Sequence, residues 1–593
     1  MQTYKAPLRD MKFVLHELMN DAPLPGHEEF TPELVESILE EAGKFCAEQL
    51  LPLNASGDLE GCAIENGVVR TPAGFKAAYD AFNEGGWGGL EAAVEFGGQG
   101  APATLAKLVE EMICATNISF GMYPGLTQGA VRALEIHGTD EQKALYLPKM
   151  ISGQWSGTMC LTEPHCGTDL GLVRTKAVAQ ADGSYRITGA KIFISAGEHD
   201  LSENIIHLVL ARLPDAPAGI KGISLFVVPK FLPDADGEAG GGNGVSCAAI
   251  EHKLGIKASS TCQMNFDEAQ GWLVGQPNRG MQAMFVMMNA ARLGVATQGL
   301  GIAEAAYQGA VLYAKERLQG RALSGAKYPE KAADPIIVHP DVRRMLLTMR
   351  AYVEGSRALG AWVARRLDEA NHEPDPARRA EAEEFVALLT PVVKAFFTDA
   401  GFECASLAVQ TYGGHGYIRD HGMEQLLRDA RIAMIYEGTN GVQALDLVGR
   451  KMPANFGRSL RRFFHPVAEF IDANKDHPIL GRAVGGFGRA FGALQLATFF
   501  IAEKALSDAE EAGAAATDYL RLFGLVALGF MWLKMMKLAL EKLPDAGADA
   551  PFYQAKLSTG RFYLERMLPQ VGSLLAVIKA GKGALMEMPE ELF

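Results

Sequence analysis

The sequence predicts an α+β protein of several domains, in which helical segments flank one β-rich segment. Apolar residues recur at helical spacing before residue 156 and after residue 276, whereas residues 156–275 hold short β-rich runs separated by turn residues. Of the 593 residues, 48% are hydrophobic and 21% are charged, which provides apolar material for several cores. Because helices and strands occupy separate stretches, the alternating order of a dinucleotide-binding fold is excluded.

The changes of pattern divide the chain into four predicted domains. Residues 1–155 form an N-terminal helical domain, with a glycine-rich loop at Gly85–Gly100 and a further helix from Thr104. Residues 156–275 form a middle β-barrel or β-sandwich domain that opens with a hairpin over residues 176–187 and contains a mobile loop at Asp234–Gly244. Residues 276–450 form a helical bundle. Residues 451–593 form an extra helical domain, packed on itself or on a second subunit.

Local signals refine the helical segments. Pro340 follows His339 at the start of a helical pattern, where proline suits the first turn. Gly299 and Gly301 lie inside another helical pattern, so we expect them to serve helix packing rather than nucleotide binding.

Charge and cysteine content exclude several functions. With 56 basic and 70 acidic residues the net charge is −14, which argues against nucleic acid as the main partner. The eight cysteines lack C-x-x-C spacing, so we expect reduced thiols in a cytoplasmic protein and no metal site. The longest apolar run, Leu522–Leu533, is shorter than the ~20 residues that span a bilayer, so we expect no membrane span.

Two segments of the β-rich region carry residue types suited to a planar cofactor. In Met159–Lys176, Pro164 and Gly167 force a tight turn that exposes hydroxyl and backbone N–H groups, although a purely structural turn has the same composition. In Lys191–Gly197, alternation puts Phe193 and Ser195 on one face, as it also would in an ordinary strand.

Two further segments lie in the predicted helical bundle. Gln410–Gly416 has adjacent glycines that allow close approach to a ligand, and a structural role is the alternative for His415. In Ile435–Asn440, Glu437 follows apolar residues and precedes Gly438. A desolvated carboxylate there would have a raised pKa and could act as a general base, or it could only cap its own loop.

Together and in this order, these segments resemble the acyl-CoA dehydrogenase family of flavoenzymes. TEPHCGTD at 162–169 resembles the family's flavin loop, and KIFISAG at 191–197 resembles its flavin-side strand. GGHGY, LLRDAR and IYEGTN resemble its C-terminal motif, and EFGGQG at 95–100 resembles an N-terminal loop. The resemblance covers about residues 30–450 and implies the acyl-CoA dehydrogenase fold, FAD as cofactor and an acyl-CoA as substrate.

The resemblance also implies a role for each matching residue. FAD contacts would come from Leu161, Thr162, Gly167, Thr168, Phe193, Ser195, Arg317, Gln410, Gly413, Gly414 and Thr439. Gln410, Gly413 and Gly414 would reach the FAD of a neighbouring subunit, which implies a homodimer. Substrate contacts would come from Thr168, Asn289, Arg292 and Gly438, with Arg292 against the coenzyme A part and Asn289 near the pantetheine.

Glu437 matches the family's catalytic base, and Met288–Ala291, where some members place theirs, has no carboxylate. Glu437 would remove the α-proton of the thioester while the β-hydride passes to the flavin, leaving a trans-2-enoyl-CoA. The Glu437 backbone N–H and a flavin hydroxyl would polarise the carbonyl, and each such donor commonly contributes about 3–4 kcal/mol. Departures from the family's pattern at Met159, His165–Cys166, Gln319–Gly320 and Gly441 put individual FAD contacts in doubt.

The extra block 451–593 and the opening Tyr4–Leu18 resemble a long bacterial subgroup of the family. That subgroup implies 3-(methylthio)propionyl-CoA, from dimethylsulfoniopropionate breakdown, as the favoured substrate, and a medium- or long-chain fatty acyl-CoA as the alternative. Electron-transfer flavoprotein would accept the electrons. Two interpretations are less favoured. IYEGTN argues against an acyl-CoA oxidase, and the presence of Glu437 argues against a non-catalytic flavoprotein scaffold such as a respiratory-complex assembly factor.

Overall fold

The computed structural model describes residues 3–19 and 24–593, and the chain divides into two compact units. The barrel unit comprises Lys44–Ala101 and Thr116–Gly294. The helical unit comprises Met1–Gly43, Pro102–Ala115 and Val295–Phe593. The finer division into four domains stays a prediction.

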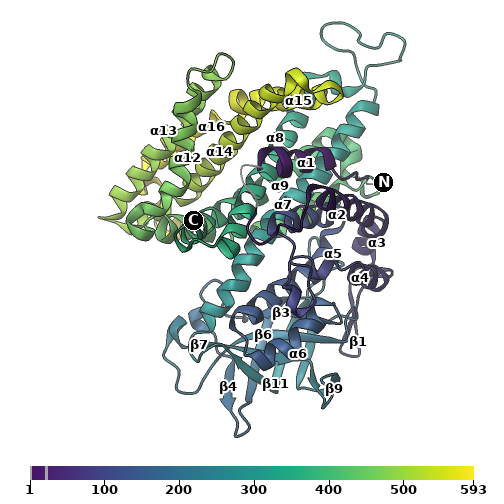
Figure 1. Ribbon diagram of the computed structural model, residues 1–593, viewed down its shortest axis with the longest axis vertical. Coiled ribbons are helices and arrows are strands. Elements are labelled where there is room, and N and C mark those ends of the chain that lie inside the picture. The colour runs from purple at the N-terminus through teal and green to yellow at the C-terminus, as the bar shows by residue number, and fades with distance from the viewer. Residues whose placement is uncertain (1–2, 20–23) are drawn as a thin grey trace. The chain divides into compact units, whose positions relative to one another are not determined.

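A sheet that closes on itself forms the centre of the barrel unit (Figure 1). Its strands are β3 (Trp155–Cys160), β4 (Lys176–Ala179), β5 (Tyr185–Ser195), β6 (Asn204–Arg212), β7 (Ile223–Pro229), β10 (Val245–Ile250) and β11 (Thr261–Val274). Strand β11 pairs with β5, then β4, β6 and β7 follow, and β7 pairs again with β11. Strands β10 and β3 extend the sheet beside β11 and β6. The predicted barrel and the predicted β4–β5 hairpin are thus confirmed.

Strand β6 is buried along its length because it separates two apolar cores. Ile206, Leu208 and Leu210 belong to the core shared with helix α6 (Asp140–Ile151), which lies beside β3 and β6 in Figure 1. The alternate residues Val209 and Ala211 belong to a second core, with residues of β5, β7 and β11. Period-two alternation of a strand between two apolar layers explains its continuous apolar sequence.

Three expectations for the strands are wrong. The hairpin of β1 (Ala63–Glu65) and β2 (Val68–Arg70) lies in the segment predicted to be helical. The hairpin of β8 (Phe231–Pro233) and β9 (Ala239–Gly242) lies partly in the predicted loop 234–244. The second strand of the hairpin predicted over residues 176–187 and the separate extended segment from Lys191 are one strand, β5. Strands of three or four residues are too short to show alternation, and β9 is nearly all glycine, so its pairing depends on backbone atoms alone.

Both units also contain helices. The barrel unit contains α3 (Pro52–Glu60), α4 (Phe75–Glu84) and α6, and the helical unit contains α1 (Leu8–Lys12), α8 (Pro340–His372), α9 (Pro376–Tyr412), α10 (Met423–Ala430), α11 (Asn440–Asp446), α12 (Arg461–Asn474), α13 (Gly481–Ala505), α14 (Ala509–Lys542), α15 (Ala550–Phe562), α16 (Gln570–Ala580) and α17 (Gly583–Met586). Helices α2 (Pro32–Phe45), α5 (Ala103–His137) and α7 (Gly280–Glu316) have residues in both units. Helix α8 begins at Pro340, as predicted.

Three helical segments are long and apolar enough to cross a membrane by length and composition: Pro376–Tyr417, Gly481–Ala505 and Ala509–Asp545. The expectation of no span rested on the longest uninterrupted apolar run, Leu522–Leu533. These longer segments contain polar residues as well, but their mean hydropathy is still high enough for a span. The first and third bury 78% and 83% of their most apolar window inside the protein. The second, helix α13, buries only 39%.

Candidate active site

The predicted flavin loop folds as a tight turn between β3 and β4. The Glu163 N–H donates to the Cys166 carbonyl at 2.9 Å, and the Cys166 N–H donates to the Glu163 carbonyl at 3.0 Å. The turn buries Leu161, leaves Thr162 half-buried and exposes Gly167 and Thr168. The loop therefore presents a hydroxyl and glycine backbone to its surroundings, as the sequence predicts.

A buried ion pair joins this loop to strand β5. The Lys191 ammonium, with no exposed side-chain surface, donates to Glu163 Oε1 at 2.9 Å and to the Leu161 carbonyl at 3.0 Å. Glu163 also accepts from Thr175 Oγ1 at 2.6 Å and from the Arg174 N–H at 2.8 Å. Burial acts to raise the pKa of Glu163, but Lys191 and these hydrogen bonds outweigh it and lower the pKa. The two predicted flavin segments are thus held together by their own charged residues.

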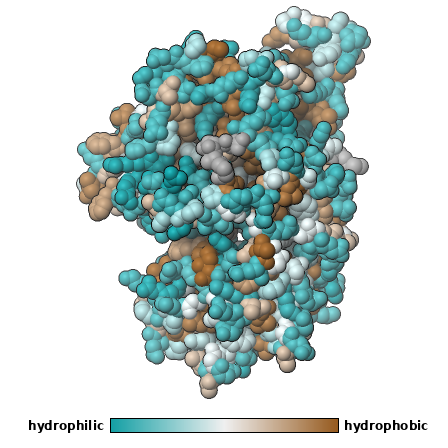
Figure 2. Space-filling model, in the orientation of Figure 1, coloured by the Kyte–Doolittle hydropathy of each residue, from teal (hydrophilic) through white to brown (hydrophobic). Residues whose placement is uncertain are grey.

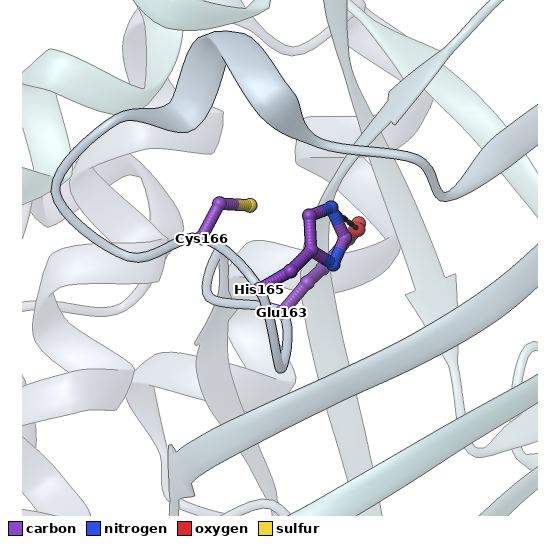
Figure 3. A group of neighbouring side chains, drawn as sticks. All are labelled: Glu163, His165 and Cys166. Carbon is purple, nitrogen blue, oxygen red and sulfur yellow. Dashed lines mark ion pairs between the residues drawn. The ribbon is translucent and has the colours of Figure 1, made fainter.

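Glu163, His165 and Cys166 lie close together in this loop (Figure 3), with one potential metal-ligand atom from each within 4.8 Å of the others. His165 Nε2 lies 3.7 Å from Glu163 Oε2 and 2.9 Å from the Leu172 carbonyl. The charge of Glu163 is already balanced by Lys191, and burial raises the pKa of the Cys166 thiol, which disfavours the thiolate that a metal would need. We therefore assign the group to the structure of the loop.

Phe193 lies at a β-bulge in β5. The register with β11 shifts between the pairs Cys262–Ile194 and Met264–Lys191, so β5 has one extra residue there. Phe193 has a φ of +59°, and 60% of its side chain is exposed, whereas Ile194 is buried. A left-handed conformation is unusual for an aromatic residue, and bulges often redirect side chains at functional sites. Ser195, two residues further on, is half-buried, and the role of both residues as one flavin-facing surface stays a prediction.

The two predicted coenzyme A contacts in the barrel unit are neighbours on α7. Arg292 Nη1 lies 3.3 Å from Asn289 Oδ1. Arg292 is 6% exposed and Asn289 is exposed, so this cation lies at the edge of the surface rather than on it.

In the helical unit, the C-terminal end of α7 lies against the glycine turn that follows α9. Tyr313 stacks on Tyr412 with ring centroids 4.0 Å apart, and its hydroxyl lies 2.8 Å from His415 Nδ1. Arg317 lies one turn beyond Tyr313, and its N–H donates to the Tyr313 carbonyl at 2.8 Å, whereas Gln410, Gly413 and Gly414 flank Tyr412 in sequence. All four are exposed, and a Cβ added at either glycine would meet no atom within 4 Å.

Glu437 lies on a strained loop directly before α11. Its φ is +55° and that of Gly438 is +84°, so two consecutive residues adopt left-handed conformations. Glu437 is half-buried, and the Thr439 hydroxyl caps α11 by accepting from the Val442 N–H at 3.2 Å. The loop therefore presents a carboxylate at the end of a helix, in a backbone conformation that must be held by other residues.

Two residues that the sequence analysis misses hold this loop. Lys394 of α9, with no exposed surface, donates to the Gly438 carbonyl at 2.8 Å. Buried Gln443 donates to the Glu437 carbonyl at 3.1 Å. A lone lysine inside the apolar run Pro391–Phe397 is the signal that could have identified Lys394, because lysine is rarely buried without a specific partner.

The structure thus forms local groups of predicted residues within each unit. The barrel unit holds Leu161, Thr162, Gly167, Thr168, Phe193, Ser195, Asn289 and Arg292, and the helical unit holds Arg317, Gln410, Gly413, Gly414, Glu437, Gly438 and Thr439. Their roles toward FAD and substrate stay predictions.

Comparisons with known proteins match four domains along the chain. Residues 32–154, 158–269 and 278–452 match the N-terminal, middle and C-terminal domains of acyl-CoA dehydrogenases, respectively. Residues 463–589 match a domain described as acetyl-CoA dehydrogenase C-terminal like.

Two relatives are similar over nearly their whole length. The 3-methylmercaptopropionyl-CoA dehydrogenase of Ruegeria pomeroyi is 46% identical over 570 residues, covering 95% of this chain and 96% of the relative. A broad-specificity linear acyl-CoA dehydrogenase of Mycobacterium tuberculosis is 34% identical over 623 residues, covering 100% of both chains.

Among solved structures, an acyl-CoA dehydrogenase from Bacillus anthracis, in complex with FAD, superimposes with a TM-score of 0.74. It covers 95% of this chain and 91% of its own at 20% identity, a likeness of fold.

Proposed function

Since the chain belongs to the acyl-CoA dehydrogenase family, whose members are FAD enzymes, we propose that it oxidises 3-(methylthio)propionyl-CoA to 3-(methylthio)acryloyl-CoA. The observation that supports the reaction is the held loop of Glu437. The 46% identity to a 3-methylmercaptopropionyl-CoA dehydrogenase supports the methylthio substrate. The 34% identity to a broad-specificity linear acyl-CoA dehydrogenase supports a fatty acyl-CoA as the second candidate.

The residues of this chain fit FAD. An exposed aromatic ring at a bulge, Phe193, suits one side of a planar ring system, and the hydroxyl and backbone of Thr162 and Thr168 suit its polar edge. Arg317, helped by the open glycine backbone at Gly413 and Gly414 of a neighbouring copy, suits a pyrophosphate. When bound, FAD supplies the two-electron acceptor for the oxidation.

Glu437 is the proposed base. Its carboxylate takes the α-proton of the thioester, and the electron pair of that C–H bond forms the new double bond as the β-hydrogen leaves with its own pair. The left-handed backbone at Glu437 fixes the direction of its N–H, which we assign to the thioester carbonyl. Arg292 provides the cation for an anionic coenzyme A in a chain of net charge −14.

Partners and location belong to the same proposal. Electron-transfer flavoprotein receives the electrons, and a homodimer lets the exposed Gln410, Gly413 and Gly414 reach a neighbour's FAD. All eight cysteines are free thiols, which supports the cytoplasm as the compartment.

Anaerobic titration with acyl-CoA compounds tests the substrate. The FAD absorbance of the purified enzyme is followed with 3-(methylthio)propionyl-CoA, butyryl-CoA, octanoyl-CoA and palmitoyl-CoA. We expect the methylthio compound to bleach the flavin fastest, whereas faster bleaching by octanoyl- or palmitoyl-CoA would establish the fatty acyl alternative. Rapid oxygen consumption during turnover, without electron-transfer flavoprotein, would instead identify an oxidase.

Replacement of the base tests the mechanism. Glu437→Gln keeps the shape of the side chain and removes the proton acceptor, so we expect flavin reduction to fall by at least about 10³-fold while bound FAD is retained. Glu424→Gln, on the neighbouring α10, serves as the control for loss of one carboxylate. Normal reduction by the Glu437 variant would exclude Glu437 as the base and would point to a different residue, whereas no reduction of the wild type by any acyl-CoA would favour the non-catalytic scaffold.

A further inference from the structure

Helix α13 has an apolar outer face that its own unit leaves uncovered. Its inner face packs on α14, with Phe487, Leu494 and Ile501 buried. On the outer face, Leu496 is 58% exposed and Phe499 is 69% exposed. Figure 2 shows hydrophobic residues reaching the surface along the left edge, where α13 lies in Figure 1. Most of this apolar helix is thus accessible, in contrast to α9 and α14.

One row of residues runs along that face at the spacing of a helix surface. Its members are Gly485, Arg489, Gly492, Leu496, Phe499 and Glu503. The N-terminal half is small and basic, and the C-terminal half is large, apolar and acidic. Cβ atoms added at Gly485 or Gly492 would meet nothing within 4 Å, so both glycines leave shallow gaps in the surface.

We propose that this row is an interface with a second copy of the chain, in which two α13 helices pair antiparallel. The two-fold axis crosses the outer face at the level of Leu494, whose own side chain points inward. The row is symmetric about that residue: Gly492 and Leu496 lie two residues either side, Arg489 and Phe499 five, and Gly485 and Glu503 nine. Antiparallel pairing therefore puts each bulky side chain opposite a small or basic one.

The residue order selects this partner over others. Leu496 of one copy fills the gap at Gly492 of the other, and the Arg489 guanidinium faces the ring of Phe499, a favourable cation–π geometry. Arg489 also comes within one turn of Glu503, and within its own chain its guanidinium donates to the Gly485 carbonyl at 3.2 Å. A lipid surface would match the apolar residues but not the acidic C-terminal end. This surface is separate from the Gln410–Gly414 turn and independent of the proposed reaction.

Cysteine cross-linking in the full-length enzyme tests the pairing. Chains with Gly485→Cys and with Glu503→Cys are co-expressed and oxidised, and we expect a disulfide-linked dimer of the two variants. Neither variant alone should cross-link. In the antiparallel pair the two copies of position 485 lie 18 residues apart along the helix axis, about 27 Å, and so do the two copies of position 503. The wild-type chain, whose own cysteines are buried or half-buried, is the oxidation control.

A second substitution checks the anchor. Adding Phe499→Ala to the Gly485→Cys chain should reduce the cross-link yield about tenfold, as expected for loss of a central aromatic contact. Val577→Ala, at an exposed apolar position on α16 outside the row, should leave the yield unchanged. Circular dichroism melting confirms that each variant is folded. Absence of the mixed cross-link in folded protein, or cross-linking of each variant with itself, would overturn the proposal. So would binding of the wild type to anionic vesicles that Phe499→Ala abolishes without changing the particle mass.

Discussion

Lys394 donates from α9 to two acceptors of the Glu437 loop. Its ammonium lies 2.8 Å from the Gly438 carbonyl and 3.0 Å from Asn440 Oδ1. Asn440 in turn donates to Asp399 Oδ1 at 2.7 Å, and burial raises the pKa of Asp399. A buried cation is costly unless it is fully hydrogen-bonded, so this arrangement ties the strained loop to the helix beneath it.

We predict that Lys394→Met slows flavin reduction while leaving the enzyme folded and loaded with FAD. Loss of the ammonium leaves the Gly438 carbonyl with only the long 3.4 Å bond from Gln443 Nε2, and a shift of the base by about 1 Å can lower the rate about 10²-fold. Stability should fall by about 1–3 kcal/mol, the usual effect of leaving a buried acceptor poorly paired. Stopped-flow reduction with the best acyl-CoA and urea unfolding measure the two effects.

Thr390→Val is the matched control for this variant. Thr390 is buried one turn earlier on α9, and its hydroxyl donates to the Val386 carbonyl at 2.7 Å, so its loss affects the helix but not the loop. We expect a similar loss of stability and an unchanged rate. Equal rates for the Lys394 and Thr390 variants would show that Lys394 has only a structural role.

At the scale of elements, helices α7 and α9 cross with their backbones in near contact. A Cβ added at Gly299 would lie 2.6 Å from the Phe397 carbonyl oxygen, and one at Gly401 would lie 2.5 Å from the Gly299 carbonyl oxygen. Gly301 is similarly close to the backbone of α5. The predicted packing role of Gly299 and Gly301 is confirmed, and the close crossing fixes the axis of the helix that carries Arg317.

We predict that Gly299→Ala and Gly401→Ala each destabilise the enzyme, by about 1–3 kcal/mol or somewhat more, because backbone atoms cannot move aside as side chains do. The double variant should lose less than the sum, since the first substitution already separates the helices. Urea unfolding measures all three. Gly360→Ala, where the nearest atom lies 3.4 Å away on the Phe397 ring, is the control and should be neutral or stabilising. Simple additivity would contradict the shared contact.

The sequence predicts most elements here because their signals are local. The start of α8 at Pro340 and the β4–β5 hairpin follow from proline and turn residues. The bulge at Phe193 could not be predicted, since it exists only in the register between β5 and β11, far apart in the chain. The same holds for the site: Glu437 follows from its motif, whereas Gln443 acts through a contact that only the folded loop creates.

At the scale of the whole molecule, one buried ionic network connects the first helix of the helical unit to its C-terminal block. It contains Asp10 of α1, Glu111 of α5, Glu304 of α7, Glu354 and Arg357 of α8 and Lys556 of α15. Arg357 contacts Asp10, Glu111 and Glu304, and Lys556 contacts Asp10 and Glu354. Segments more than 500 residues apart in sequence thereby share one set of charges.

Counted over residues 3–19 and 24–593, the network has one carboxylate more than it has cations. Arg350, which bonds Glu354 at 2.6 Å, brings the cations to three, against four carboxylates. Burial acts to raise the pKa of Asp10, but Lys556 and Arg357 outweigh it and lower the pKa. For Glu111 burial prevails and raises the pKa to about 7, so Glu111 is the member that takes up the surplus proton.

This surplus makes stability depend on pH in a direction opposite to that of an ordinary ion pair. A carboxyl whose pKa is raised by folding contributes its full stability below its unfolded pKa and loses it as pH rises through the folded value. For Glu111 the window runs from its usual 4.5 to about 7, equivalent to about 3 kcal/mol. We predict that the unfolding free energy of wild type relative to Glu111→Gln falls by that order between about pH 5 and pH 8. Urea unfolding of both proteins across this range measures the difference.

Lys556→Met provides the contrast: it leaves Asp10 and Glu354 without their shared cation and should destabilise the protein by about 3–5 kcal/mol throughout the range. A difference between wild type and Glu111→Gln that does not change with pH would show that another member of the network carries the proton.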